Sequence, residues 1–390
     1  MQTISIILII VLMGLSSVTC MGSSRPSARQ LIWQAAKTEA AELNLSNHGL
    51  TELPPEVGQL SNLKVLRLDD NALTELPPEI GQLTNLTELH LTYNQLSTLP
   101  PEIGKLSKLV ELDVGNNHLV SLPAEIGRLS SLEWLLFNNN RLAQLPPEVS
   151  RLGNLRELVL GGNRLSTLPP ELGQLPHLTS LDLVQNQFTT IPTEVYGLPN
   201  LRQLYLGGNQ LVNVPPRIGE LSALEILWLR NNQLTTLPPE IGQMAHLSRL
   251  DLSNNQLQGL PTEFGRLTNL TELYLTNNRL RAFPPELGRL SNLIELDLGG
   301  NQLVEVPDEI GELSTLERLL LNDNQLSAVS PELGRLTNLI GLSLRNNRLT
   351  TLPPELGQMP KLEVLDVAGN KSLTLPPELE RRSDLKIIKF

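Results

Sequence analysis

The sequence predicts an α/β solenoid, in which a short strand on one face alternates with an irregular, short-turn segment on the other. Two observations carry this prediction. Asparagine recurs fourteen times at intervals of 23 residues, from Asn71 to Asn370, without an insertion. In each interval a leucine-rich stretch precedes a proline-rich one. A fixed period of this size indicates stacked copies of one small unit. Residues 40–390 are therefore expected to form fifteen 23-residue repeats, starting at Ala40 and ending with the unit at Leu362, plus a terminal strand.

The first part of each repeat has the pattern of a strand with one buried face. In the second repeat, Leu66 and Leu68 alternate with Val65, Arg67 and Asp69. Alternation with a period of two is typical of a half-buried strand, because successive side chains point to opposite faces. The strand is therefore expected to present its third, fifth and seventh repeat positions away from the core.

The rest of each repeat has residues suited to a bend and a short turn. The Asn71 amide can both donate and accept hydrogen bonds, so it can satisfy backbone groups that turn inward, and stacked copies would form an asparagine ladder. Pro77 and Pro78 exclude a strand, Glu79 suits the positive start of a short helical turn, and Gly81 permits close packing. These residue types are structural and carry no information about a partner.

The LPPEIGxL ending of the units and the ladder asparagine resemble the leucine-rich repeat superfamily. The 23-residue form is similar to that of Ras-pathway scaffolds, plant Ras-group proteins and many bacterial proteins. The resemblance covers residues 40–390. It implies a curved horseshoe with a parallel β-sheet on the concave side and short 3-10 or irregular turns on the convex side. It does not imply a particular function, because partners differ across the family.

The two ends of a solenoid need covers, and the sequence offers different ones. Residues 21–39 are expected to hold a linker and a capping helix that starts at Ser27, with an apolar face packed on the first repeat around Trp33. That face is predicted to comprise Leu31, Ile32, Ala35 and Ala36. At the other end we expect a final strand with an open edge, where the chain could self-associate. Its apolar residues are Leu385, Ile387, Ile388 and Phe390, and the bases expected to discourage edge pairing are Arg381, Arg382, Lys386 and Lys389.

Residues 1–20 have the pattern of a signal peptide. An apolar run at residues 4–15 is followed by small residues up to Cys20, and it is too short for a typical membrane span. Three outcomes remain open: cleavage near Cys20, lipidation of Cys20, or an uncleaved membrane anchor. We expect an exported protein of the cell envelope or exterior, in contact with a membrane only through this segment. The alternative is a cytoplasmic protein.

Composition excludes several kinds of partner and cofactor. The net charge of −11 opposes binding to nucleic acid, which requires clustered Lys and Arg. Cys20 is the only cysteine, which excludes an intrachain disulfide and a cysteine metal site. No cofactor is expected.

The positions expected on the concave face contain two of the three tryptophans and two of the four tyrosines. Trp134, Leu136 and Val159 form one apolar group, and a second surrounds Trp228. Aromatic and Arg anchors inside a polar rim are typical of protein interfaces, although such residues could instead cover one another along the sheet. Acids in the same columns predict a partner with a basic face. The predicted binding residues are His90, Asp113, Trp134, Leu136, Val159, Asp182, Tyr205, Ile226, Trp228, Arg230, Asp251 and Tyr274.

Enzymatic sites were sought around His90, the one histidine expected on the concave face. It should neighbour Asp113, with Glu88 and Glu111 nearby. No serine or cysteine nucleophile recurs beside it, and one histidine with carboxylates is a poor transition-metal set. We therefore expect no catalytic residue and no metal ligand.

These observations favour a non-catalytic module that recognises a protein or peptide on its concave face and is exported. Two alternatives remain: an intracellular signalling scaffold of the Ras-pathway type, and a structural or self-assembling component of the cell envelope.

Overall fold

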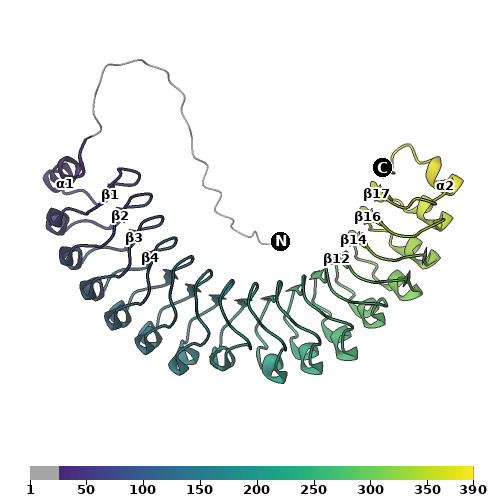
Figure 1. Cartoon of the computed structure of the whole chain (residues 1–390), viewed down its shortest axis with the longest axis horizontal. Helices are drawn as coiled ribbons and strands as arrows, with labels where there is room; N and C mark the ends of the chain where they lie inside the picture. Colours follow the sequence, from purple (N-terminus) through teal and green to yellow (C-terminus); the bar gives the residue numbers. More distant parts are fainter. Residues whose placement is uncertain (1–25, 390) are drawn as a thin grey trace, which may run out of the picture.

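The protein forms an open arc of stacked repeats, with the strands on the inner side and short helices on the outer side (Figure 1). The computed structural model describes residues 26–389. The predictions made for residues 1–20, including Cys20, and for Phe390 lie outside the described residues. Within residues 26–389, no helix has the length and apolar character needed to cross a membrane.

The inner side of the arc is one parallel sheet of sixteen strands, which confirms the predicted fold. The first fifteen strands each occupy the third to fifth positions of their repeat, and their central residue is buried, as for Leu66. The last strand occupies the second to fourth positions of its unit. Neighbouring strands pair with an offset of one repeat, so that Leu66 lies opposite Leu89. The strands are β1 (Glu42–Asn44), β2 (Val65–Arg67), β3 (Glu88–His90), β4 (Glu111–Asp113), β5 (Trp134–Leu136), β6 (Glu157–Val159), β7 (Ser180–Asp182), β8 (Gln203–Tyr205), β9 (Ile226–Trp228), β10 (Arg249–Asp251), β11 (Glu272–Tyr274), β12 (Glu295–Asp297), β14 (Arg318–Leu320), β16 (Gly341–Ser343), β17 (Val364–Asp366) and β18 (Lys386–Ile388).

The outer side consists of short 3-10 helices, as predicted from the prolines and the acidic first turn. Most of them begin with proline, whose missing N–H is not needed at a helix start. They are η1 (Pro55–Gln59), η2 (Pro78–Gln82), η3 (Pro101–Lys105), η4 (Ala124–Arg128), η5 (Pro147–Arg151), η6 (Pro170–Gln174), η7 (Thr193–Gly197), η8 (Pro216–Glu220), η9 (Pro239–Gln243), η10 (Thr262–Arg266), η11 (Pro285–Arg289), η12 (Asp308–Glu312), η13 (Pro331–Arg335) and η14 (Pro354–Gln358). Two short strands, β13 (Glu305–Val306) and β15 (Ala328–Val329), add a small second sheet that the repeat pattern did not predict.

A glycine in most of these helices allows the repeats to stack closely. A Cβ added to Gly81 would lie 2.7 Å from the Glu102 carbonyl oxygen of the next repeat. Tyr196 occupies this position in η7, and the Arg217 guanidinium lies 4.6 Å from the centre of its ring. The regular stacking therefore depends on a residue without a side chain, and η7 departs from it.

The asparagine ladder forms as predicted and joins each repeat to its neighbours. Asn94 donates to the carbonyl oxygens of Leu68 at 2.9 Å and Leu91 at 3.1 Å, and its Oδ1 accepts from the N–H of Leu73 at 3.0 Å. The same pattern recurs up to Asn370, whose amide donates to Leu344. Because these asparagines are buried, their hydrogen bonds replace those to water and hold the strands in register.

A second set of asparagines, not predicted from the sequence, lies at the end of several repeats. Asn269 donates to the Ala245 carbonyl oxygen at 2.7 Å, and Asn292 donates to that of Thr268 at 2.8 Å. Equivalent bonds are made by Asn85, Asn154, Asn200 and Asn338. The repeats are therefore joined by side-chain amides at two positions of the unit, which strengthens the frame that carries the strands.

Helix α1 (Ala28–Lys37) covers the first repeat. Ser27 caps it, because its hydroxyl accepts from the Gln30 N–H and the Gln30 side chain accepts from the Ser27 N–H, a complete capping box. Ile32 and Ala35 are buried against the first repeat. The sequence-based assignment was wrong for Ala36, which is exposed, and for Trp33, which points away from the core and is 66% exposed. The helix is short and only its Ala28–Ile32–Ala35 edge faces the repeat.

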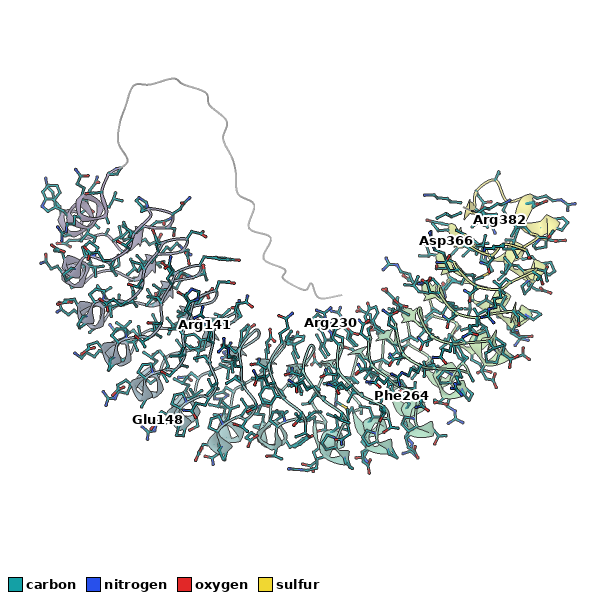
Figure 2. All side chains as sticks on the ribbon, in the orientation of Figure 1. Arg141, Glu148, Arg230, Phe264, Asp366 and Arg382 are labelled. Atoms are coloured by element: carbon teal, nitrogen blue, oxygen red, sulfur yellow. The ribbon has the colours of Figure 1, made fainter. Side chains whose placement is uncertain are left out.

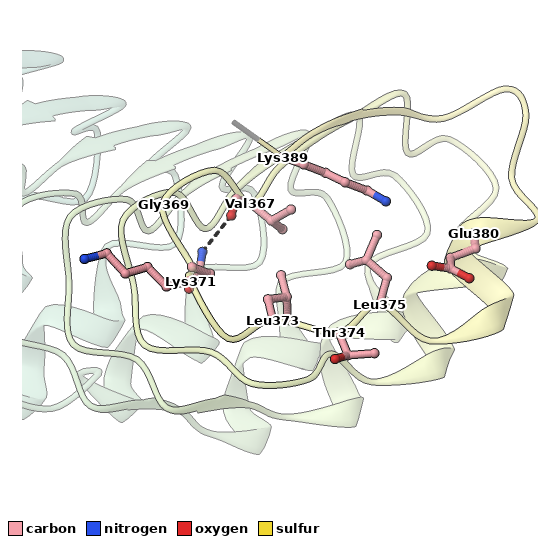
Figure 3. A pocket seen from close by; sticks show the side chains of 9 residues that line it. Val367, Gly369, Lys371, Leu373, Thr374, Leu375, Glu380 and Lys389 are labelled. Carbon is pink, nitrogen blue, oxygen red and sulfur yellow. Dashed lines mark hydrogen bonds between the residues drawn. The ribbon is translucent and has the colours of Figure 1, made fainter.

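The last repeat ends with α2 (Pro377–Glu380) and β18. Arg382 is one of the bases expected to discourage edge pairing, and its side chain also binds within the chain. Its guanidinium donates to the carbonyl oxygens of Gly357, Met359 and Leu362, and pairs with Asp384 at 2.7 Å. It therefore satisfies backbone acceptors of the preceding repeat. Beside it, a hollow of about 640 Å³ opens between Leu373, Leu375, Glu380 and Lys389 (Figure 3).

Candidate binding surface on the concave face

All twelve predicted binding residues lie on or directly after the strands of the concave sheet. Arg230 lies on the inner side of the arc, whereas Glu148 lies on the outer side (Figure 2). The predicted residues are partly exposed, with three departures. Trp134 and Arg230 are exposed, and Asp251 is buried. The surface extends over nine neighbouring strands, from β3 to β11.

The first aromatic group is centred on Trp134 of β5. This residue is 36% exposed, and among residues 26–389 its ring contacts no other aromatic ring and no cation. Leu136 of the same strand lies in register with Val159 of β6. Trp134 itself lies in register with Glu111 on one side and Glu157 on the other. An exposed indole is therefore flanked by two carboxylates.

The second aromatic group is packed against itself. The rings of Tyr205 and Trp228 meet edge to face, with centroids 4.8 Å apart and planes at 72°. The Arg230 guanidinium lies 5.3 Å from the centre of the Trp228 ring. The Tyr205 hydroxyl donates to Gln203 at 2.9 Å. The lateral covering considered from the sequence is therefore present here, in contrast to the group at Trp134.

The acids in the same columns as the aromatic residues, which we call the acidic rim, are neutralised by arginine at both ends of the surface. Arg67 pairs with Glu88 at 3.6 Å, Arg249 with Glu272 at 3.1 Å and Arg318 with Glu295 at 3.2 Å. Each pair joins neighbouring strands, one repeat apart. The pairs of Arg249 and Arg318 could have been found in the sequence, because an Arg and a Glu 23 residues apart occupy the same column. They leave a smaller set of acids available to a partner.

Four neighbouring acids without such a pair form what we call the acidic segment, on strands β4 to β7. It comprises Glu111, Asp113, Glu157 and Asp182, and none of them forms an ion pair with Lys or Arg within residues 26–389. Burial raises the pKa of Asp182, opposed by the hydrogen bond from the Val184 N–H. Burial also raises the pKa of Glu157, and the charges of Asp182 and Glu111 raise it further. The segment therefore concentrates uncompensated negative charge beside Trp134.

Several of the concave aspartates also have a local structural role that the sequence analysis missed. The Oδ1 atoms of Asp113, Asp182 and Asp251 accept hydrogen bonds from N–H groups two residues on, at 3.0, 2.8 and 2.9 Å. Short Asp side chains often cap turns in this way. An aspartate at the fifth position is therefore partly explained by the turn that follows its strand.

His90 of β3 lies between two glutamates. Its Nε2 is 3.4 Å from a carboxylate oxygen of Glu88, and its Nδ1 is 3.8 Å from one of Glu111. Asp113 lies in register with His90 on the neighbouring strand. Burial raises the pKa of Asp113, opposed by a backbone hydrogen bond from Gly115 and by His90, and supported by Asp69 and Glu111.

Comparison with protein-family models gives matches over most of the repeats. The model described as leucine rich repeat matches residues 153–211, 222–280, 268–326 and 314–371. A leucine-rich repeat region model matches residues 42–117, and a model of two leucine-rich repeat copies matches residues 199–243. The chain belongs to the leucine-rich repeat family. No curated protein matches it.

Solved structures of leucine-rich repeat proteins resemble the whole arc. A protein of Leptospira interrogans is 40% identical, with a TM-score of 0.79 over 91% of this chain and 97% of that one. The plant peptide hormone receptor RGFR1, in complex with RGF2, is 30% identical, with a TM-score of 0.67 over 90% of this chain and 67% of that one. The ectodomain of the Arabidopsis thaliana receptor kinase GASSHO1/SCHENGEN3, in complex with CASPARIAN STRIP INTEGRITY FACTOR 2, is 32% identical, with a TM-score of 0.68. The match covers 90% of this chain, which spans half the length of that ectodomain.

An internalin of Listeria monocytogenes shares the fold at 20% identity, with a TM-score of 0.60 over 93% of each chain. At this identity the likeness concerns the fold alone.

Proposed function

We propose that this chain is a non-catalytic recognition module that binds a protein or peptide on its concave face. The observation that carries the proposal is the environment of Trp134. Its exposed ring lies between Glu111 and Glu157, and neither glutamate forms an ion pair with Lys or Arg within the described part of the chain. An aromatic ring and flanking carboxylates suit a cationic side chain of a partner, through cation–π and ion-pair contacts.

The partner is therefore a protein or peptide that presents Lys or Arg next to an apolar side chain. The apolar part would contact Leu136 and Val159, which are partly exposed beside Trp134. Charge complementarity would speed encounter and select the partner, whereas the aromatic anchor would supply most of the affinity. The peptide complexes of the plant receptors support this proposal by their likeness in fold and sequence.

The same likeness supports export, since one of these neighbours is an ectodomain of a membrane receptor. Intact mass and N-terminal sequencing of the protein from its native host test this point. A start near Cys20, with or without a lipid mass on that residue, is the expected result. An intact Met1 would favour the cytoplasmic scaffold instead.

The binding proposal is tested by comparative capture from the surroundings of the native host. The purified wild-type chain is compared with Trp134→Ala and with Trp33→Ala, which removes a more exposed indole from α1, away from the concave face. A partner is accepted only if it also binds as a purified protein, measured by surface plasmon resonance. The proposal requires that Trp134→Ala weakens this binding and that Trp33→Ala does not. Equal binding to all three chains would refute the assignment of the surface.

A further inference from the structure

Within residues 26–389, one group of side chains has the composition and closeness of a metal-binding site. It consists of Glu88, His90 and Glu111, and one ligand atom from each lies within 4.8 Å of the others. We propose that this group binds a divalent transition-metal ion of the zinc type. The metal site shares Glu111 with the surroundings of Trp134, but it requires no partner and is tested without one.

The backbone places the three side chains on one face with little freedom. Glu88 and His90 are two residues apart on β3, so both point to the concave side. Glu111 lies in register with Glu88 on β4. Both strands belong to a sheet that is paired on each side, and the His90 side chain is only 12% exposed. Sites on strands hold ligands more accurately than sites on loops.

The distances are close to those that the metal requires. Zinc binds His nitrogen and carboxylate oxygen at roughly 2.0–2.2 Å in tetrahedral geometry, so its ligand atoms lie about 3.4 Å apart. The Glu88 carboxylate oxygen is already 3.4 Å from His90 Nε2. Glu111 is 3.8 Å from the other ring nitrogen and would reach the ion by rotation about its own side-chain bonds. No movement of the backbone is needed.

The charges around the group favour a cation. Asp69 and Asp113 add two carboxylates nearby. Burial raises the pKa of Asp113, and the charge of Asp69 raises it further. Arg67 is the one Arg or Lys within the described residues that pairs with the group, at 3.6 Å from Glu88. A bound ion would reduce the repulsion among these carboxylates. Asp113 lies in register with His90 on the neighbouring strand and adds negative charge beside the group.

The expectation of no metal ligand from the sequence rested on the presence of a single histidine. The sequence could show that Glu88 and His90 share a face, but not that both ring nitrogens lie beside carboxylates. That convergence depends on the side-chain torsions of two strands. Carboxylate and imidazole together suit zinc and its neighbours in the first transition row.

The test is a titration of the untagged chain with Zn²⁺ at pH 7.5 by isothermal calorimetry, repeated with Co²⁺ by visible absorption. Wild-type protein is expected to bind one ion that gives the absorption of Co²⁺ with nitrogen and oxygen ligands. His90→Ala and Glu111→Gln should each weaken this binding by about tenfold or more, with unchanged far-ultraviolet circular dichroism. His118→Ala, an exposed histidine outside the group, serves as the matched control and should bind as wild type.

Two results would overturn the inference. One is the absence of Zn²⁺ binding by the folded wild-type chain. The other is equal affinity in wild type and His90→Ala, which would place the ion on another histidine. Either result leaves the recognition proposal intact, because that proposal is tested by Trp134→Ala in the absence of added metal.

Discussion

The two aromatic groups both lie on the concave face, with Trp134 at the third position of its repeat and Trp228 at the fifth, but they are built differently. In the second group, Tyr205 and Trp228 cover each other and Arg230 covers Trp228. In the first, Trp134 has no ring partner among residues 26–389 and remains exposed between two carboxylates. An aromatic residue on a solenoid sheet can therefore stabilise the sheet or remain available to a partner. The aromatic residue stabilises the sheet where a nearby residue supplies a ring or a cation that contacts it, and remains available to a partner where none does.

The largest expected effect is on binding at the first group. Trp134→Ala should weaken binding of an identified partner by about 2 kcal/mol or more, which is roughly 30-fold, because a central aromatic anchor is lost. The free energy of unfolding should change by less than the binding free energy, since within residues 26–389 the ring has no aromatic or cation contact to lose. Titration calorimetry and urea denaturation measure the two quantities. A loss of stability as large as the loss of binding would mean that Trp134 is structural.

The second group should respond in the opposite way. Trp228→Ala removes the edge-to-face contact with Tyr205 and the contact with Arg230, so the free energy of unfolding should fall by about 1–2 kcal/mol. Trp228→Phe keeps a ring against Tyr205 and should recover part of this loss. Urea midpoints at constant slope provide the measurement. If Trp228→Ala leaves the midpoint unchanged, the ring contact is not stabilising and the contrast between the groups disappears.

A smaller effect is expected from the acidic segment, where one substitution should raise stability and weaken binding. Burial raises the pKa of Asp182, so its ionised form destabilises the folded state. This destabilisation is absent below the ordinary Asp pKa of about 3.9, where Asp182 is protonated in both the folded and the unfolded state. It grows as the pH rises from there through the raised pKa of the folded state. Asp182→Asn keeps the acceptor for the Val184 N–H and should raise the melting temperature slightly at pH 7.

The gain in melting temperature from Asp182→Asn should shrink as the pH is lowered toward 4. At neutral pH, the Asp182→Asn variant should bind a basic partner more weakly than wild type does. Calorimetric melting at several pH values tests the first point, and association rates at low and high salt test the second. A melting temperature lower than that of wild type at pH 7 would show that the carboxylate is stabilising.

The smallest effect is expected at the neutralised end of the acidic rim. Arg318 pairs with Glu295 at 3.2 Å, and the arginine side chain is 67% exposed. Exposed pairs of this kind contribute roughly 0–1 kcal/mol. Arg318→Ala should therefore change the free energy of unfolding by less than about 0.5 kcal/mol, measured by urea denaturation. It should also leave binding at Trp134 unaltered, and a marked loss of affinity would extend the binding surface to β14.

Sequence reasoning predicted the concave location of all twelve candidate residues, because the position of a residue within its repeat determines the face of the sheet on which it lies. It also identified Trp134 and Trp228 as the centres of two groups. It could not distinguish them, since Tyr205 and Trp228 come together through their side-chain torsions across two strands. For the same reason it did not predict that Arg382 donates to carbonyl oxygens of the preceding repeat. It also assigned Trp33 to the covered face of a helix whose packed side is narrow.

The sequence by itself determined the period, the buried leucines, the asparagine ladder and the composition of each face. The physical reason is that every repeat contacts only its neighbours, so a pattern of 23 residues is also a pattern in space. Only the tertiary structure decided which charges remain uncompensated and which rings remain exposed. Those properties depend on long side chains that choose among several rotamers once the strands lie side by side. The separation of Trp134 from the self-packed pair at Trp228, and the convergence of Glu88, His90 and Glu111, were decided at this level.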